Sequence, residues 1–254
     1  MKEVVRQYWD NEPCGTRDIP YPVGSLDYFE AIAERRDRLD WFIPEYAQFD
    51  KWKGKKVLEV GCGAGSDSIR FAQAGADITS IDLSPRSVLL TRERLHLYGC
   101  KGNVLEADAE EMPFDNDNFD FAYSYGVLHH TPNIYRAINE IYRVLKSGGQ
   151  ICIMLYHKYS LVALQMWLMF GLFKLKPTRS ISDILANHHE SLGTKAYTVN
   201  EVERLFSSFD NVKIHTRVTA YDIRYSRNGY LPIGVAKLIP QCLGWNIIIQ
   251  GQKP

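Results

Sequence analysis

The sequence lacks the features that mark several classes of protein. Its 30 Lys and Arg balance 30 Asp and Glu, so no net charge steers the whole chain toward nucleic acid or an anionic membrane. No apolar run approaches the roughly 20 residues that span a bilayer, and the N-terminal residues 1–6 lack the apolar core of a signal peptide. The five cysteines are scattered without a C-x-x-C pair, which argues against a disulfide framework or a zinc site. We therefore expect a soluble cytoplasmic protein with free thiols.

The sequence does contain an apolar segment that runs into three alternating glycines. The strand-like segment VLEV is followed by Gly61, Gly63 and Gly65, and then by a helical pattern. Glycine lets the backbone approach a ligand closely, and the helix that follows presents free N–H groups and a positive dipole end. A second apolar segment ends at Asp82, whose carboxylate would accept hydrogen bonds from ribose hydroxyls. Together these features predict a nucleoside-cofactor site on a parallel sheet.

The glycine spacing argues against a dinucleotide enzyme. Such enzymes use G-x-G-x-x-G, whereas this loop reads G-x-G-x-G, with Ser66 in place of the last glycine and Glu59 inside the strand. The segments VLEVGCGAG and ITSIDLSP resemble the first two motifs of the class I S-adenosylmethionine-dependent methyltransferases. The resemblance implies that the loop backbone, Cys62 included, holds the methionine part of the cofactor and that Leu83 lies against adenine. We expect Glu59 to accept N–H groups of the loop, with direct contact to the ligand as the alternative.

Two further segments carry the resemblance, which is strong over residues 54–155 and weak on both flanks. Within EADAEEMPFDNDNFDFAYS, the pair Asp108 and Ala109 resembles the adenine-binding pair of the family, in which the carboxylate takes the exocyclic amine and the next N–H meets a ring nitrogen. A solvated loop acid is the alternative for the carboxylate. The segment YSYGVLHH resembles the exit of strand four in the menaquinone-methyltransferase-like branch. The backbone there would hold the amino group of the cofactor, so Ser124 or Tyr125 is expected to contact it.

The adjacent histidines His129 and His130 are the candidates for acid–base chemistry. The reaction that the resemblance implies is an in-line displacement at an activated sulfonium methyl, which mainly requires alignment and exclusion of water. An acceptor hydroxyl or amine also needs a base with a pKa near neutral, and histidine suits that role. We expect one histidine to order the loop and the other, with His129 preferred, to face the acceptor. No metal is expected, because adjacent side chains rarely aim at one ion and the spacing fixes no third ligand.

The acceptor is expected to be a small molecule, with S-adenosylhomocysteine as the other product. The motif of amino-nitrogen methylation on bases does not follow the fourth predicted strand, and the Pro-Cys pair at 13–14 lies away from the place of a cytosine nucleophile. No basic stripe with interleaved aromatics suggests nucleic-acid binding. The alternatives are a nucleic-acid or protein methyltransferase, an enzyme of the same fold with non-methyl chemistry, and a cofactor-binding module that has lost turnover.

Residues 1–53 precede the predicted cofactor-binding domain, and we expect them to form an N-terminal helical arm that covers the site. It is rich in aromatic and charged side chains. We expect Tyr8 or Trp9 to close over the methyl end of the cofactor and Arg35 or Arg36 to reach its carboxylate. The alternative is that the aromatic residues only pack the arm on the domain and that the arginines are solvated.

An insertion, residues 156–197, is the second flanking segment. Its apolar stretch 161–176 predicts a buried lid helix, a dimer surface or an interfacial anchor, and would suit a quinone or lipid-linked acceptor. The polar residues His188, His189 and Glu190 then either line the mouth of the site or form a polar loop.

Alternating strand and helix patterns predict a doubly wound α/β sheet. The expected strands are 56–60, 77–82, 103–107, 119–125, 150–155, a strand from 212, and 245–250. A helix is expected to start at Thr131-Pro132 and to end at residues 147–149. The resemblance implies a seven-stranded Rossmann-like sheet whose last two strands form an antiparallel hairpin, in a domain spanning residues 54–254.

Overall fold

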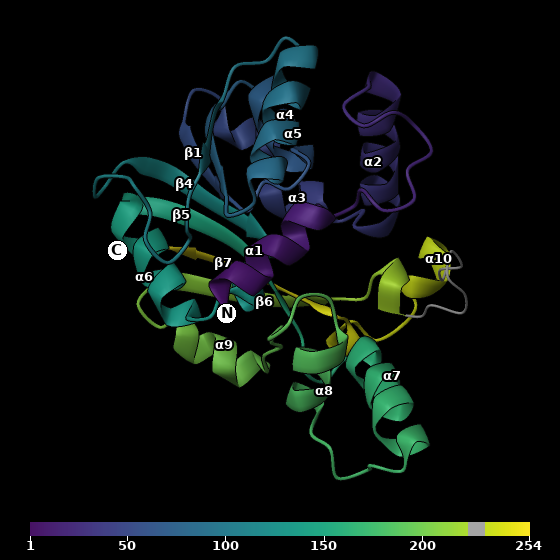
Figure 1. Cartoon of the computed structure of the whole chain (residues 1–254). Coiled ribbons are helices and arrows are strands. Elements are labelled where there is room, and N and C mark those ends of the chain that lie inside the picture. The colour runs from purple at the N-terminus through teal and green to yellow at the C-terminus, as the bar shows by residue number, and fades with distance from the viewer. Residues whose placement is uncertain (223–231) are drawn as a thin grey trace.

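A computed structural model describes residues 1–222 and 232–254, and within these ranges the strands form one seven-stranded sheet (Figure 1). The order across the sheet is β3-β2-β1-β4-β5-β7-β6. The strands are β1 (Lys56–Val60), β2 (Asp77–Asp82), β3 (Asn103–Glu106), β4 (Phe119–Tyr125), β5 (Leu145–Tyr156), β6 (Asp210–Arg217) and β7 (Asn246–Gln252). Strands β1 to β5 pair in parallel, whereas β7 pairs antiparallel with both β5 and β6. The predicted doubly wound sheet with an antiparallel last pair is confirmed.

Helices cover both faces of the sheet. The helices named in the argument are α1 (Lys2–Asn11), α2 (Leu26–Leu39), α3 (Ile43–Ala47), α4 (Ser66–Gln73), α5 (Pro85–Leu97), α6 (Ile134–Val144), α7 (Leu161–Phe170), α8 (Ile181–His188), α9 (Val199–Leu205) and α10 (Ile233–Ala236). Short 3-10 turns are η1 (Phe49–Trp52), η2 (Leu128–His130), η3 (Leu172–Lys174), η4 (Ala220–Asp222) and η5 (Gln241–Leu243). Figure 1 shows α4 and α5 on one side of the sheet and α6 and α9 on the other.

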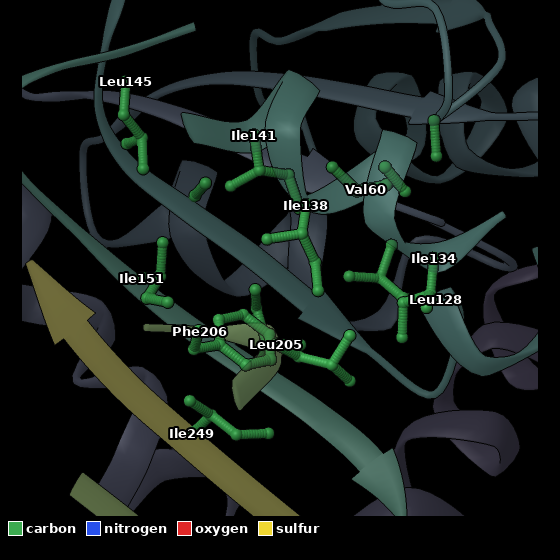
Figure 2. Close-up of a cluster of buried hydrophobic side chains, with 14 of the residues drawn as sticks. Val60, Leu128, Ile134, Ile138, Ile141, Leu145, Ile151, Leu205, Phe206 and Ile249 are labelled. Atoms are coloured by element: carbon green, nitrogen blue, oxygen red, sulfur yellow. The ribbon is translucent and has the colours of Figure 1, made fainter. Parts of the chain in front are cut away.

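The face under α6 and α9 carries a continuous aliphatic core (Figure 2). Helix α6 contributes Ile134, Ile138 and Ile141 at i, i+4 and i+7, all at most 5% exposed, because this spacing puts them on one side of a helix. Strands β1 and β7 meet them with Val60 and Ile249. This packing fixes the carboxyl ends of the central strands, where the site lies.

Helix α6 begins later and ends earlier than the sequence predicts. Its N-cap is Asn133, whose side chain accepts a hydrogen bond from the N–H of Arg136 at 3.2 Å. Thr131 instead donates to the carbonyl of Leu128 at 2.7 Å and so closes η2. The helix ends at Val144, and the glycines at 148–149 belong to β5, since both pair with the backbone of Lys253 near the C-terminus at 2.8–2.9 Å.

The apolar segment of the insertion forms α7, and it is not a buried helix. Ala163 is its one fully buried residue, while Leu164 and Met169 are 50% and 54% exposed. Among the described residues its main neighbours are α8, η3 and η4, which are short and leave part of its surface exposed. In the part of the chain that the structure describes, no helix is long and apolar enough to cross a membrane. The dimer-surface and interfacial-anchor hypotheses for this segment stay open.

Candidate functional site

A cavity lies at the carboxyl ends of β1 to β4, where parallel strands of a doubly wound sheet gather their ligand-binding loops. The residues that end or follow these four strands and line the cavity are Gly61, Cys62, Gly63, Asp82, Leu83, Asp108, Ala109, Tyr125 and Gly126. From the other side comes one face of α1, at i, i+3, i+4 and i+7: Lys2, Val5, Arg6 and Trp9. The fold therefore brings the predicted cofactor residues together from segments that are far apart along the chain and adds the N-terminal helix over them.

The glycine loop has a conformation and a spacing that only glycine accepts. Gly61 has φ +86°, and a Cβ built on it would lie 2.1 Å from Cγ2 of Val127. Gly63 also has positive φ and lines the cavity. Gly65 serves a different purpose, because it is the N-cap of α4 and its Cβ would meet Thr91 of α5 at 3.1 Å. Gly61 thus makes room for the side chain of Val127, Gly63 supplies a left-handed turn at the cavity wall, and Gly65 lets two helices pack closely.

Asp82 holds the loop and keeps acceptor capacity for a ligand. Its Oδ2 accepts the N–H of Gly63 at 2.9 Å and its Oδ1 accepts the N–H of Ser84 at 2.9 Å. The N–H of Leu83 also interacts with this carboxylate, and since a carboxylate has about four lone-pair sites, acceptor capacity remains for a ligand. Leu83 lines the same cavity beside it. A carboxylate next to an apolar side chain fits a ribose joined to a base.

Asp108 lies at the cavity wall but already has a cationic partner. Lys2 of α1 approaches Asp108 at 2.5 Å and Glu110 at 2.8 Å. A second oxygen of Asp108 accepts the N–H of Glu110 at 2.8 Å. Ala109 also lines the cavity. The predicted adenine pair is therefore at the cavity, and the arm neutralises the carboxylate.

Glu59 supports the loop through hydroxyl groups rather than through loop N–H groups. It is 3% exposed, and its Oε2 accepts hydrogen bonds from Ser68 of α4 and, at 2.9 Å, from Ser80 of β2. Burial and the neighbouring Asp67 raise the pKa of Glu59 to about 8. The side chain joins two elements behind the loop and also reaches the cavity wall.

Replacing Glu59 by glutamine is expected to flatten the pH dependence of stability. A carboxyl group whose pKa is raised in the folded state, here from 4.5 to about 8, favours folding less as pH rises through that window. The wild-type chain should lose at most about 1.4 kcal/mol per pH unit from this group between pH 5 and pH 8. Glu59→Gln should lack that decline in thermal unfolding from pH 5 to pH 9, and the exposed Glu203→Gln should keep it. Parallel profiles for the wild type and Glu59→Gln would contradict the assignment.

The two candidates at the end of β4 are in different positions. Tyr125 lines the cavity, and its hydroxyl donates to Asp40 at 2.9 Å and accepts from Asn246 at 2.8 Å. Ser124 is fully buried, is not among the cavity-lining residues, and donates to the carbonyl of Val60 at 3.0 Å. Of these two side chains, that of Ser124 ties β4 to β1 and that of Tyr125 faces the cavity.

The adjacent histidines are held inside the protein. His130 lines the cavity, whereas His129 is fully buried and stacks on Tyr156 with ring centroids 3.7 Å apart. The Nδ1 atom of His130 lies 2.9 Å from Ser191 Oγ and 3.1 Å from Thr194 Oγ1. Its Nε2 and both nitrogens of His129 are buried without a hydrogen-bond partner among the described residues. Burial lowers the pKa of His129 well below its usual range, so the ring is neutral at pH 7.

In the arm, Trp9 rather than Tyr8 reaches the cavity. The Trp9 ring meets His130 edge-on at 5.1 Å, while Tyr8 packs on Trp9 at 4.9 Å and is not among the cavity-lining residues. Arg35 and Arg36 both line the cavity. Arg35 donates to the carbonyls of residues 15 and 17, and Arg36 pairs with Asp67. The predicted arm residues are thus present at the site, with Tyr8 behind Trp9.

Several buried polar residues support the loop and were missed in the sequence. Arg94 of α5 is 2% exposed and donates to the carbonyl of Ala64 at 3.1 Å, to Ser66 Oγ at 3.0 Å and to the carbonyl of Phe29 at 3.1 Å. Asp67 accepts from Arg36 and, at 2.8 Å, from the hydroxyl of Tyr123. No local motif marks these residues, because their partners come from elements far apart in the sequence.

Comparison with known proteins agrees with the site. Residues 58–153 match the sequence family described as "Methyltransferase domain". The chain is 36% identical over 102 residues to a rice 2-methyl-6-phytyl-1,4-hydroquinone methyltransferase, covering 39% of this chain and 30% of that protein. It is 30% identical over 149 residues to the 27-O-demethylrifamycin SV methyltransferase of Amycolatopsis mediterranei, covering 58% of this chain and 48% of that protein. The chain thus matches less than half the length of these curated relatives.

Solved structures share the whole architecture. A protein from Pyrococcus horikoshii superimposes with a TM-score of 0.59 at 17% identity, covering 98% of this chain and 99% of the other. A SAM-dependent methyltransferase from Aquifex aeolicus gives a TM-score of 0.55 at 16% identity, covering 87% and 93%. At such identities the likeness concerns the fold. Residues 58–153 therefore match the methyltransferase-domain family, and the chain has the fold of the class I S-adenosylmethionine-dependent methyltransferases.

Proposed function

We propose that this chain binds S-adenosylmethionine and transfers its methyl group to a small-molecule acceptor by in-line displacement. The observation that carries the proposal is the convergence of the glycine loop, Asp82 and the Asp108–Ala109 pair on one cavity inside the matched domain. The residues fit the cofactor, since Gly61 and Gly63 bring backbone to the cavity wall with positive φ and the carboxylate of Asp82 retains acceptor capacity.

The cavity residues have distinct roles in this proposal. The cofactor supplies a methyl group already activated by the positive sulfonium. The backbone at Gly61 and Gly63 holds its methionine part, and Arg36 or Arg35 takes the carboxylate. Asp82 accepts from the ribose hydroxyls, Leu83 packs on adenine and the N–H of Ala109 meets a ring nitrogen. Asp108 accepts a hydrogen bond from the exocyclic amine of adenine and also forms an ion pair with Lys2.

We propose an apolar acceptor that ionises without a strong base. Neither His129 nor His130 offers an accessible unpartnered nitrogen to the cavity, so catalysis relies mainly on alignment and exclusion of water. Val127, Trp9 and Tyr221 are apolar or aromatic at the cavity wall. The relative named for a phytyl hydroquinone suggests a phenolic or quinone-like molecule. A lipid-linked acceptor is compatible with the exposed apolar side chains of α7.

A binding and turnover experiment tests the function. Isothermal titration should give micromolar or tighter binding of S-adenosylmethionine and S-adenosylhomocysteine and no heat with NADH. Methyl release should then be screened over hydroquinones, phenols, amines, thiols and sugars, with the largest rate expected for apolar phenols or hydroquinones. Binding of NADH in place of the two sulfur compounds would overturn the proposal. Tight, salt-dependent binding of nucleic acid would favour the macromolecular alternative.

We propose that residues 1–53 are a lid for the domain 54–254, with the insertion 156–197 bordering the acceptor end. Helix α1 holds onto the domain at two points: Lys2 pairs with Asp108 and Glu110, and Asp10 accepts from Ser84 Oγ and the N–H of Arg86, each at 2.9 Å. Figure 1 shows this helix between the two helical layers. The unpaired state of all five cysteines supports a reducing, cytoplasmic location. The exposed apolar side of α7 supports self-association, which light scattering would detect.

Trp9→Ala is expected to separate the two aromatic candidates of the arm. Loss of the indole uncovers the cavity, so the dissociation constant for S-adenosylmethionine should rise about tenfold, equivalent to about 1.4 kcal/mol. Tyr8→Ala is the matched control, because Tyr8 lies on the same helix behind Trp9, and its effect should stay within about twofold. Removal of residues 1–24 should weaken binding further. Unchanged affinity and turnover in the truncated chain would remove the lid proposal.

A further inference from the structure

Buried nitrogen atoms without partners gather beside the cavity, at the junction of η2 with the loop that follows α8. His129 and His130 are 0% and 5% exposed, and His189 lies opposite them on the other segment. Both nitrogens of His129, together with Nε2 of His130 and Nε2 of His189, are buried and make no well-aligned hydrogen bond within residues 1–222 and 232–254. A buried polar atom left without a good hydrogen bond costs about 1–3 kcal/mol, so a cluster of such atoms calls for a ligand.

Glu190 supplies a negative charge at the centre of this group. Its Oε2 lies 3.3 Å from Nε2 of His130 and 3.8 Å from Nε2 of His189. His129, His130 and Glu190 each offer a ligand atom, and these atoms lie within 4.8 Å of one another. In a tetrahedral site with bonds of about 2.0–2.1 Å, neighbouring ligand atoms lie about 3.3–3.4 Å apart. The 3.3 Å between His130 and Glu190 already suits such a site. The other separations, which lie within 4.8 Å in this group of three and are 3.8 Å between Glu190 and His189, must shorten by side-chain rotation when an ion binds.

We propose that His129, His130, His189 and Glu190 form a binding site for a divalent transition metal of the Zn²⁺ class. Three imidazoles and one carboxylate are the donor set that such borderline ions prefer over Mg²⁺ or Ca²⁺. Spacing along the chain indicates no third ligand, and the fold supplies the missing ligands from the insertion. The ring centroids of His129 and His130 lie 4.3 Å apart, so the two adjacent histidines face one region.

The surrounding groups are those that orient metal ligands. Hydroxyls of Ser191 and Thr194 contact Nδ1 of His130 and leave Nε2 for the ion, and Tyr156 donates to Oε2 of Glu190 at 2.9 Å. The side chains of His189 and Glu190 are 20% and 30% exposed, which gives an ion a path inward. An ion bound there would tie the end of β4 to the insertion, next to the proposed acceptor end of the cavity.

The test measures metal binding to the full chain without cofactor or acceptor, so its outcome is separate from that of the methyl-transfer assay. Chelator-stripped protein is titrated with Zn²⁺ and, as a spectroscopic probe, with Co²⁺. We expect one Zn²⁺ per chain with micromolar or tighter affinity, a rise in unfolding temperature, and visible Co²⁺ absorption; Mg²⁺ should give none of these. His189→Asn and Glu190→Gln should each weaken Zn²⁺ binding at least tenfold.

Matched variants make the result decisive. His188→Asn is the control, because His188 points to Arg179 and stacks on Phe170 outside the cluster, and it should bind Zn²⁺ like the wild type. Cys14→Ser tests for adventitious thiolate binding and should also leave the affinity unchanged. A cooperative thermal unfolding transition in metal-free His189→Asn and Glu190→Gln shows that these variants are folded. The proposal is overturned by absence of Zn²⁺ binding, by equal effects of His188→Asn and His189→Asn, or by loss of binding in Cys14→Ser.

Discussion

Gly61→Ala is expected to abolish measurable binding of S-adenosylmethionine, with the dissociation constant rising at least about 100-fold, equivalent to about 2.7 kcal/mol. The new methyl group would lie 2.1 Å and 2.7 Å from the two γ-carbons of Val127, closer than atoms can approach, so the loop after β1 must move. Alanine also disfavours the φ of +86° at this position. Isothermal titration with the cofactor and with S-adenosylhomocysteine measures the effect.

Two further variants separate the steric clash from backbone strain. Gly54 has a similar φ of +70°, but no atom of the described residues lies within 4 Å of the place that a new methyl group would take. Gly54→Ala should therefore lower thermal stability only slightly and leave cofactor affinity unchanged. Adding Val127→Ala to Gly61→Ala removes both γ-carbons and should restore part of the affinity. Binding by Gly61→Ala at wild-type strength would show that the cofactor does not depend on this loop.

Asp82→Ala is expected to weaken S-adenosylmethionine binding about 10- to 100-fold while the chain remains folded. The carboxylate accepts the N–H groups of Gly63 and Ser84, and in the proposed complex it also accepts from the ribose hydroxyls. A hydrogen bond to a charged group contributes about 1.5–3 kcal/mol, and each 1.4 kcal/mol is a factor of about ten in affinity. The loss should appear equally with S-adenosylhomocysteine, because both compounds carry the same ribose.

Asp77→Ala is the matched control for this prediction. Asp77 is the first residue of β2 and Asp82 is the last. Asp77 is exposed at the amino-terminal end of the strand, away from the cavity. Its replacement should change the affinity by less than about twofold. Equal losses in Asp77→Ala and Asp82→Ala would indicate general damage to β2 rather than loss of a ribose contact.

The sequence alone determined the strands of the sheet and their loops. The apolar segment before Gly61, the carboxylate at the end of β2 and the pair Asp108–Ala109 depend on local patterns. Local chemistry of this kind, with glycine where φ is positive and acids directly after strands, can be read without tertiary contacts. The fold class and the loop residues that β1, β2 and β3 bring to the cavity follow from it.

Only the tertiary structure decided how side chains outside these motifs are used. The sequence allowed either Tyr8 or Trp9 at the site and preferred His129 to His130, whereas the structure brings Trp9 and His130 to the cavity wall. It also buries Ser124 against β1 and leaves α7 half exposed.

The physical reason is that these outcomes depend on partners distant in sequence. Lys2 meets Asp108 across 106 residues, and Ser191 meets His130 across 61. A buried polar side chain adopts the orientation in which a hydrogen-bond or ionic partner offsets the free-energy cost of its burial. That partner is identified only in the folded structure. The backbone conformation of the glycine loop depends on local residues and can therefore be predicted from the sequence. Which partners form hydrogen bonds with the buried polar groups depends on the whole fold.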